Sequence, residues 1–270
     1  MLAAGLAAGG LAMCLSGSSS TAPQLTLAAL KDTASLAKLL ADQGLDPVAA
    51  AEKAALFAEA AEVLVAAGAS PASAAKAYFV PGRVEVMGKH TDYAGGRSLL
   101  AAISKAFCVV TVDRDDAQCR FFSTARPGDD VTLPMSASLQ PKQGGHWTNY
   151  PATALRRLSA NFPGLKGVDC SIACDIPAAS GMSTSSAIIC AVFLAVNGRN
   201  DLRSRPEFKA NISSEEELWE YLGCNENGQN FNGLVGDKGV GTFGGSEDHT
   251  AIMSSVHKQS PPPLDSQGWF

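Results

Sequence analysis

The sequence lacks an excess of positive charge, and it lacks the cysteine patterns of zinc or disulfide proteins. Its 21 Lys and Arg residues against 26 Asp and Glu residues give a formal net charge of -5, whereas contacts to nucleic-acid phosphates need a basic surface. Its seven cysteines are scattered, with no CxxC pair and no zinc-type Cys/His spacing. We therefore expect no nucleic-acid partner, and reduced, mostly structural thiols in a cytoplasmic protein.

The apolar N-terminal stretch, residues 1–24, lacks the features of an export signal and of a membrane span. It has no Lys or Arg near its start, and glycines interrupt its apolar run. A signal peptide needs the charged region, and a spanning helix needs about 20 consecutive apolar residues. We expect an unstructured leader and no membrane partner. A lipoprotein cleavage site at Cys14 is the lesser alternative, since Met13 before it is a poor fit.

What is present is enough apolar sequence for a substantial core, since 46% of the 270 residues are hydrophobic and 17% are charged. Residues 25–75 are predicted to be helical, with a second helix that Asp46-Pro47 starts and Gly68 ends. Residues 76–256 mix strands and helices without regular βαβ spacing, which predicts an α+β domain. The Pro-rich residues 257–270 are expected to be disordered.

Within the predicted α+β domain, pattern and composition assign individual elements. The strand-like segments are YFVPGRVEVMG, AFCVVTVDR, CRFFSTA, DVTLP and VDCSIACDI. The segments WTNYPATALRRLSANF and TSSAIICAVFLAVNG are predicted to be helices.

Three polar, Gly-rich segments stand beside these elements. The first, GRVEVMGKHTDYAGG (residues 82–96), places more hydrogen-bonding capacity after a strand than a turn requires. The second, PAASGMSTSSA (residues 177–187), follows a strand and opens a helix, so its backbone N–H groups and hydroxyls suit a phosphate. It is not a Walker A loop, and a Ser/Thr-capped core helix is the equal alternative.

The third segment, GTFGGSEDHTAIM (residues 241–253), lets backbone pass close to a ligand through its glycines. An acidic residue there suits the orientation or deprotonation of a substrate hydroxyl. Helix capping by Ser246 or Asp248 is the simpler alternative.

Together the three segments resemble the GHMP small-molecule kinases, and within them the galactokinases. The first is similar to the galactokinase signature GRVNLIGEHTDYNGG, the second to the family phosphate loop PxxxGLxSSxA, and the third to the GGxxDQ segment. HWTNYPATAL is similar to the W-x-NY segment of galactokinases. The resemblance covers roughly residues 78–255.

The resemblance implies a GHMP kinase N-terminal domain, a mixed sheet backed by helices, that phosphorylates a monosaccharide hydroxyl with ATP and Mg²⁺. Asp248 matches the catalytic base, which accepts the proton of the attacking hydroxyl. Arg83 matches the arginine that stabilises transition-state charge. A purely structural ion pair is the alternative role for Arg83.

The other implied positions are binding residues. The expected sugar-binding residues are Lys89, His90, Thr91, Asp92, Tyr93 and Gly245. The expected ATP-binding residues are Pro177, Ser180, Gly181, Met182, Ser183, Thr184 and Ser185. The expected Mg²⁺ ligands are Ser185 and Glu226, with a solvated loop carboxylate as the alternative for Glu226.

The sequence also departs from the family pattern. Lys89 stands where galactokinases carry Glu, and an ammonium group can only donate hydrogen bonds, so we expect a sugar that differs from galactose. His249 replaces the Gln after the catalytic Asp, and we expect it to pack beneath the loop. No GxGxGG motif follows Asp248, so the C-terminal domain is expected to be missing or truncated.

Three functional hypotheses follow. The favoured one is a galactokinase-like sugar 1-kinase. The others are a catalytically silent sugar- and ATP-binding regulator and a truncated inactive fragment. Retention of Arg83, Ser185 and Asp248 argues against a pure binding protein, because binding alone needs no base.

Overall fold

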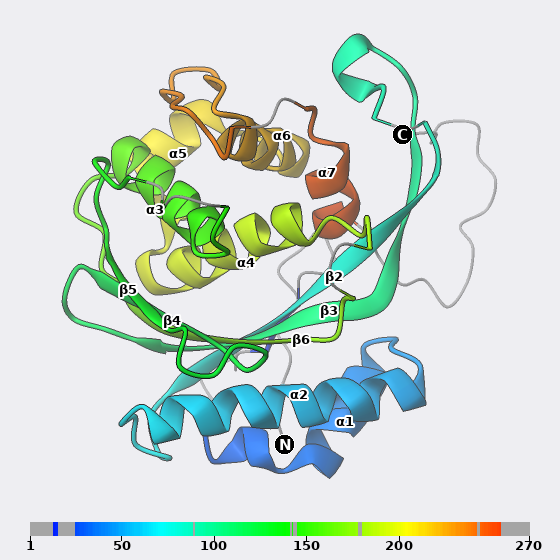
Figure 1. Ribbon diagram of the computed structural model, residues 1–270, viewed down its shortest axis with the longest axis vertical. Coiled ribbons are helices and arrows are strands. Elements are labelled where there is room, and N and C mark those ends of the chain that lie inside the picture. The colour runs from blue at the N-terminus through cyan, green and yellow to red at the C-terminus, as the bar shows by residue number, and fades with distance from the viewer. Residues whose placement is uncertain are drawn as a thin grey trace.

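The alternating apolar segments form one mixed sheet of six strands in the order β1-β2-β3-β6-β4-β5 (Figure 1). The computed structural model describes residues 13–15, 25–88, 90–140, 142, 145–177, 180–241 and 244–254. β4 and β6 pair in parallel, and the other neighbours pair antiparallel. The strands are β1 (Met13–Leu15), β2 (Ala75–Met87), β3 (Leu99–Asp113), β4 (Gln118–Ser123), β5 (Val131–Pro134) and β6 (Val168–Cys174).

Both faces of the sheet are buried. Successive side chains along a strand point to opposite sides, so each strand contributes side chains to two cores. On β2, Tyr78 and Val80 face one core while Ala77 and Phe79 face the other. Each core is closed by a layer of helices, so the protein has three layers with the sheet in the middle (Figure 1). This is the α+β domain, with a mixed sheet backed by helices, that the sequence predicts.

One helical layer consists of α1 (Thr33–Asp42) and α2 (Pro47–Ala66), which follow a 3₁₀ turn at Ala29–Lys31. Asp46 caps α2, since its Oδ1 accepts hydrogen bonds from the N–H groups of Val48 (2.9 Å) and Ala49 (3.3 Å). The predicted start at Asp46-Pro47 is therefore confirmed, and α2 ends shortly before Gly68, as expected. The layer packs as an Ala- and Leu-rich core that includes Phe57.

The opposite layer carries the helices of the functional segments. Two of them confirm predicted helices, α3 (Asn149–Asn161) and α4 (Thr184–Asn200). Two were not predicted, α5 (Pro206–Asn211) and α6 (Glu215–Asn227). The last helix, α7 (Glu247–Ser254), begins where a helix start at Ser246 or Asp248 was the alternative in the sequence. Two further 3₁₀ turns are Asp92–Ala94 and Leu202–Ser204.

The β2–β3 pair contains an irregularity that bears on the site. The register shifts between Pro81 and Arg83. Proline has no N–H for the ladder, and such shifts commonly accompany proline or glycine in a strand. Gly82 is closely surrounded, because an added Cβ would lie 3.2 Å from Ile176 Cδ1 and from Met182 O. The bulge therefore brings the backbone before Arg83 against the segment that precedes α4.

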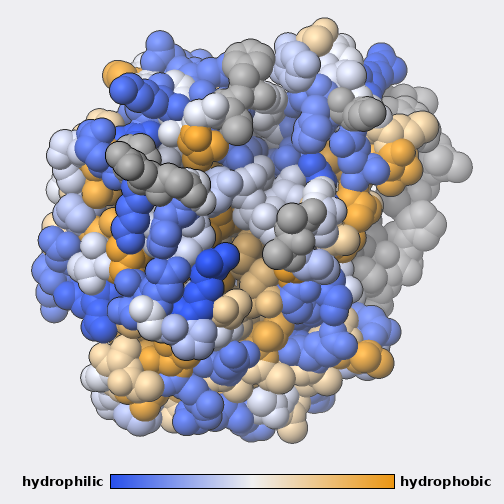
Figure 2. Space-filling model, viewed as in Figure 1, coloured by the Kyte–Doolittle hydropathy of each residue, from blue (hydrophilic) through white to orange (hydrophobic). Residues whose placement is uncertain are grey.

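The surface is mostly polar on the face shown in Figure 2, with hydrophobic residues in smaller groups between hydrophilic ones. Among the described residues, the most exposed large apolar side chains include Val86 (59% exposed) and Met87 (66%) at the end of β2. None of the described helices combines the length and the apolarity that a membrane crossing requires. Residues 1–12 and 16–24 of the expected leader and the expected disordered tail lie outside the described residues. Residues 13–15 of that leader form β1, which pairs with β2, where the sequence predicts an unstructured segment.

Candidate active site

Arg83 and Asp248, which are 165 positions apart in the sequence, form a direct ion pair. Arg83 lies on β2 and is 3% exposed, and Asp248 lies in the first turn of α7. Arg83 Nε donates to Asp248 Oδ1 at 2.6 Å, and its second nitrogen donates to the carbonyl of Gly181 at 2.6 Å. One buried guanidinium therefore joins the α7 carboxylate to the loop before α4, which is a charge-assisted and geometrically specific arrangement.

In the loop before α4, the side chain of Ser183 bonds to Asp248 and does not cap the helix that follows. Gly181 has φ 71° and Ser183 has φ 52°, so both adopt the left-handed conformation, which costs energy at a non-glycine residue. Ser183 does not cap α4 with its side chain. Its Oγ donates instead to Asp248 Oδ2 at 2.5 Å. The capped-core-helix alternative is thus wrong for Ser183, and the first N–H groups of α4 stay suited to an anion.

A buried polar cluster lies beneath Asp248. Ser186 Oγ donates to Glu226 Oε2 at 2.8 Å and lies 3.5 Å from Asp248 Oδ2. His249, 2% exposed, places Nε2 3.0 Å from the same Glu226 oxygen. Burial opposes ionisation of Glu226, but hydrogen bonds with His249, Ser186 and Ser185 outweigh it and lower its pKa. Glu226 is therefore a carboxylate at neutral pH.

This placement corrects one alternative for Glu226. The side chain lies on α6 and Glu226 is 8% exposed, so it is not a solvated loop carboxylate. A carboxylate and a serine hydroxyl are hard oxygen donors of the kind Mg²⁺ prefers. Ser185 and Glu226, the two expected Mg²⁺ ligands, line the same cavity. Their chemistry fits the ion.

A cavity of about 400 Å³ opens beside Asp248. Residues from four segments line it: His90, Tyr93, Ser185, Ser186, Glu226, Asn227, Gly244, Gly245, Glu247, Asp248 and His249. Its walls supply carboxylates, hydroxyls and an imidazole, which is the mixture of donors and acceptors that a polyhydroxylated ligand needs. The expected residues that line this cavity are His90, Tyr93, Ser185, Glu226, Gly245 and Asp248, whereas Arg83, Thr91, Asp92, Gly181, Met182, Ser183 and Thr184 do not line it.

His90 and Glu247 form the outer wall of this cavity. His90 Nδ1 lies 2.7 Å from Glu247 Oε1, and Ser98 donates to the other oxygen of Glu247. Glu247 is 8% exposed. Burial raises its pKa, and the negative charges of Asp92 and Glu85 act in the same direction. Glu247 was not predicted, although it stands next to Asp248 in the sequence.

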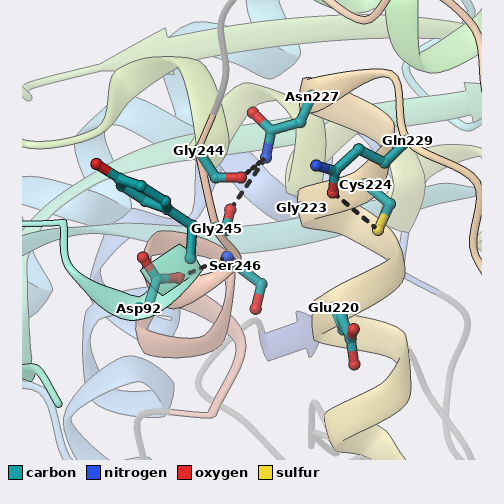
Figure 3. A pocket seen from close by; sticks show the side chains of 10 residues that line it. Asp92, Glu220, Gly223, Cys224, Asn227, Gln229, Gly244, Gly245 and Ser246 are labelled. Atoms are coloured by element: carbon teal, nitrogen blue, oxygen red, sulfur yellow. Dashed lines mark hydrogen bonds between the residues drawn. The ribbon is translucent and has the colours of Figure 1, made fainter. Parts of the chain in front are cut away.

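A second cavity, of about 290 Å³, lies next to the first (Figure 3). Asp92 Oδ2 accepts from the N–H groups of Ser246 (2.9 Å) and Glu247 (3.0 Å), so Asp92 holds the start of α7. Asn227 Nδ2 donates to the carbonyls of Gly244 (2.8 Å) and Gly245 (3.1 Å). A Cβ at Gly245 would lie 1.7 Å from Asp92 Oδ2, so only glycine permits this approach.

The remaining expected residues are placed unevenly around the site. Met182 O accepts from the N–H of Arg83 at 3.4 Å, and Thr184 begins α4. Ser180 Oγ donates to the Pro177 carbonyl at 2.7 Å, and both residues are exposed and line neither cavity. Thr91 also lines neither cavity.

One expected residue and one residue that was not expected remain. Lys89, with the substrate preference inferred from it, lies outside the described residues. Ser186 was not predicted as a site residue, although it belongs to the same run of hydroxyl side chains in the sequence.

Two regions of the chain match models of known protein families. Residues 67–111 match the galactokinase galactose-binding signature, and residues 149–223 match the N-terminal domain of GHMP kinases. A galactokinase from Streptococcus thermophilus is 31% identical over 189 residues, which are 70% of this chain and 47% of that protein. A galactokinase from Lactobacillus helveticus is 34% identical over 113 residues, 41% of this chain and 29% of that protein.

Solved structures give the same result. The crystal structure of Lactococcus lactis galactokinase complexed with galactose matches with a TM-score of 0.54 and 26% identity, covering 66% of this chain and 41% of that one. The chain thus spans about half, or less, of the length of these relatives. The two matched regions, the identities and the shared fold show that the chain contains a GHMP kinase N-terminal domain and is similar to galactokinases over the regions that align.

Proposed function

We propose that the protein transfers the γ-phosphoryl group of ATP to a hydroxyl of a monosaccharide. The observation that carries this proposal is the contact of Arg83 with both Asp248 and the loop at Gly181, beside a polar cavity. A phosphoryl transfer needs a base near the acceptor, a cation near the transferred group and backbone N–H groups around the phosphates. Asp248, Arg83 and the first N–H groups of α4 are the groups that would meet these three requirements.

In the proposed reaction, Asp248 accepts the proton of the sugar hydroxyl as that oxygen bonds to the γ-phosphorus. The bond from the γ-phosphorus to the bridging oxygen breaks, and ADP leaves with its electron pair. Ser183 and Arg83 hold the Asp248 carboxylate in place through 2.5 Å and 2.6 Å hydrogen bonds. Arg83 also stabilises the negative charge of the transferring group, and the start of α4 binds the phosphates.

Ser185 and Glu226 would hold Mg²⁺ in this proposal, and the ion supplies neutralisation of phosphate charge. The chain's own contribution is to keep Glu226 ionised through its contacts with Ser186 and His249. His90, Asp92, Tyr93 and Gly245 would surround the sugar.

Asp248→Asn tests the proposal. The change removes the base but keeps the shape, so we expect ADP release with the best of a panel of sugars to fall about 10²- to 10⁴-fold. Mg-ATP affinity by calorimetry should change little. Asp237→Asn is a matched control, because Asp237 Oδ2 pairs with Arg156 Nε at the same 2.6 Å and its side chain is similarly buried, but it lines neither cavity.

Two results would contradict the proposal. One is a wild-type chain that releases no ADP with any sugar, and the other is equal loss of turnover in Asp237→Asn and Asp248→Asn. Retained ATP binding without turnover in the wild-type chain would favour the silent regulator instead.

The identity of the sugar is a separate proposal that depends on Lys89. We infer that its ammonium group shifts preference away from plain galactose, toward an acidic or otherwise different sugar, since it donates hydrogen bonds and carries positive charge. Lys89→Glu is expected to move the ratio of kcat/KM values back toward galactose. An unchanged ratio would remove the basis for this inference.

A further inference from the structure

The N-terminal helical layer contributes one fully buried charge to the sheet. Lys53 lies on α2, is 0% exposed, and its ammonium group donates to Asp175 Oδ2. Its other acidic neighbour, Glu52, is 3.7 Å away and about half exposed. An ammonium group is costly to bury, and it is retained only where a partner and hydrogen bonds compensate.

Asp175 joins three parts of the fold. Its Oδ1 accepts from the N–H of Ala106 on β3 at 2.8 Å, and its own N–H donates to the Ala106 carbonyl at 3.3 Å. Lys105 approaches Oδ2 at 3.2 Å from the solvent side, with its side chain 42% exposed. Burial opposes ionisation of Asp175, but hydrogen bonds from Lys53, Ala106 and Lys105 outweigh it and lower its pKa. The side chain is a carboxylate fixed from α2 and β3.

Asp175 also marks the start of the loop that leads to α4. β6 ends at Cys174, and Ile176 comes directly after Asp175. Ile176 is 7% exposed, and its Cδ1 lies so close to Gly82, the residue before Arg83, that a Cβ added at Gly82 would be 3.2 Å from it. At the other end of the loop, Arg83 holds the Gly181 carbonyl. The described part of the loop is therefore anchored at both ends, by Asp175 and by Arg83.

We propose that Lys53 is a positioning residue for this loop: through Asp175, α2 sets where the phosphate-binding backbone begins. The inference rests on the proposed function, and it gives a role to α1 and α2, which lie outside both regions matched by family models. Lys53 lines neither of the two cavities at the candidate site, so its effect would pass through Asp175 and the loop. A displaced start of the loop would move Gly181 and Ser183 relative to the phosphates.

Lys53→Met tests the inference, because methionine fills similar space without charge. We expect the Kd for Mg-ATP to rise at least fivefold and hydrogen exchange of the amides at 181–183 to become faster. Phe57→Leu, a change in the same buried face of α2, controls for lost stability: it should lower Tm without either effect. Lys105→Met removes the other, exposed ion pair of Asp175 and serves as a second control. We expect it to leave the Kd for Mg-ATP within twofold of the wild-type value.

Asp175→Asn keeps the test valid if Lys53→Met does not fold, since it retains the Oδ1 acceptor and weakens the Lys53 contact. We expect the same two effects at smaller size. Wild-type loop exchange and wild-type Mg-ATP affinity in a folded Lys53→Met or Asp175→Asn protein would overturn the inference and leave Lys53 a structural residue. Failure of the wild-type chain to bind Mg-ATP would contradict the proposed function, while the amide exchange would still decide the positioning role.

Discussion

The two faces of the sheet differ in how many buried charged side chains they carry. The face under α1 and α2 is covered by Leu, Ala and Phe side chains. The buried charged or titratable polar side chains of the described residues are Lys53, Arg83, Arg156, Arg157, Glu226, Glu247 and His249. Of these only Lys53 belongs to the α1/α2 layer. The opposite layer holds a large apolar core as well, so burial itself does not separate the two faces.

The difference indicates how the fold divides its tasks. The α1/α2 layer stabilises the sheet by apolar burial. The layer with α4, α6 and α7 does the same around Phe193 and Leu155, but it also contains the ion pairs Arg83–Asp248, Arg156–Asp237 and His249–Glu226. Such pairs contribute little net stability, because the desolvation cost offsets their attraction. Two of them, Arg83–Asp248 and His249–Glu226, lie at the candidate active site.

A matched pair of core truncations gives the largest expected effect on stability. Phe57 on α2 and Phe193 on α4 are both 0% exposed. Phe57→Ala and Phe193→Ala should each lower the free energy of unfolding by about 3–5 kcal/mol in urea titrations. Only Phe193→Ala should also weaken Mg-ATP binding, because α4 carries the phosphate-binding end. Equal loss of binding in both variants would contradict the division of tasks.

Two carboxylates on the α6/α7 side should respond to pH with opposite signs. The pKa of Glu226 is lowered in the folded protein, so its contribution to stability is present above the ordinary glutamate pKa and is lost as the pH falls through the lowered value. The pKa of Glu247 is raised, so stability is lost as the pH rises through the range between its ordinary and its raised pKa.

Urea unfolding between about pH 3 and pH 7 measures this contrast. In Glu226→Gln, the free energy of unfolding should decrease less as the pH falls. In Glu247→Gln, it should decrease less as the pH rises. Exposed Glu220→Gln, also on α6, is the control. A change of slope with the same sign in both variants would show that the two environments do not differ as described.

The smallest expected effect concerns the thiols, which lie in both cores. Cys108 belongs to the α1/α2 core, and Cys119 and Cys190 belong to the opposite one. Burial raises the pKa of all three thiols, and that of Cys119 to about 11. Iodoacetamide labelling of the folded protein, mapped by mass spectrometry, should be slow at all three and fast in urea. Fast labelling of one core alone would show that its face opens more readily.

Much of the fold was predictable because its signals are local. Asp46-Pro47 and Gly68 mark α2, and alternating apolar residues mark β2, β3 and β6. α6 was not predicted, although Ser214 caps it by accepting from the N–H of Glu217 at 3.2 Å. The acidic residues of its first turn are typical of a helix start. Its many polar and charged residues make the periodic spacing of its apolar residues difficult to detect in the sequence.

Within the site, the motifs indicated which residue types matter but not which atoms meet. The sequence by itself determined the helices and strands, the hydroxyl-rich loop and the candidate Arg83 and Asp248, because these depend on neighbours within a few residues. Only the tertiary structure decided that Arg83 hydrogen-bonds to both Asp248 and Gly181. It also decided that Glu226 is buried against His249 and that Lys53 pairs with Asp175. Such contacts join residues up to 165 positions apart, so they exist only after the layers pack around the sheet.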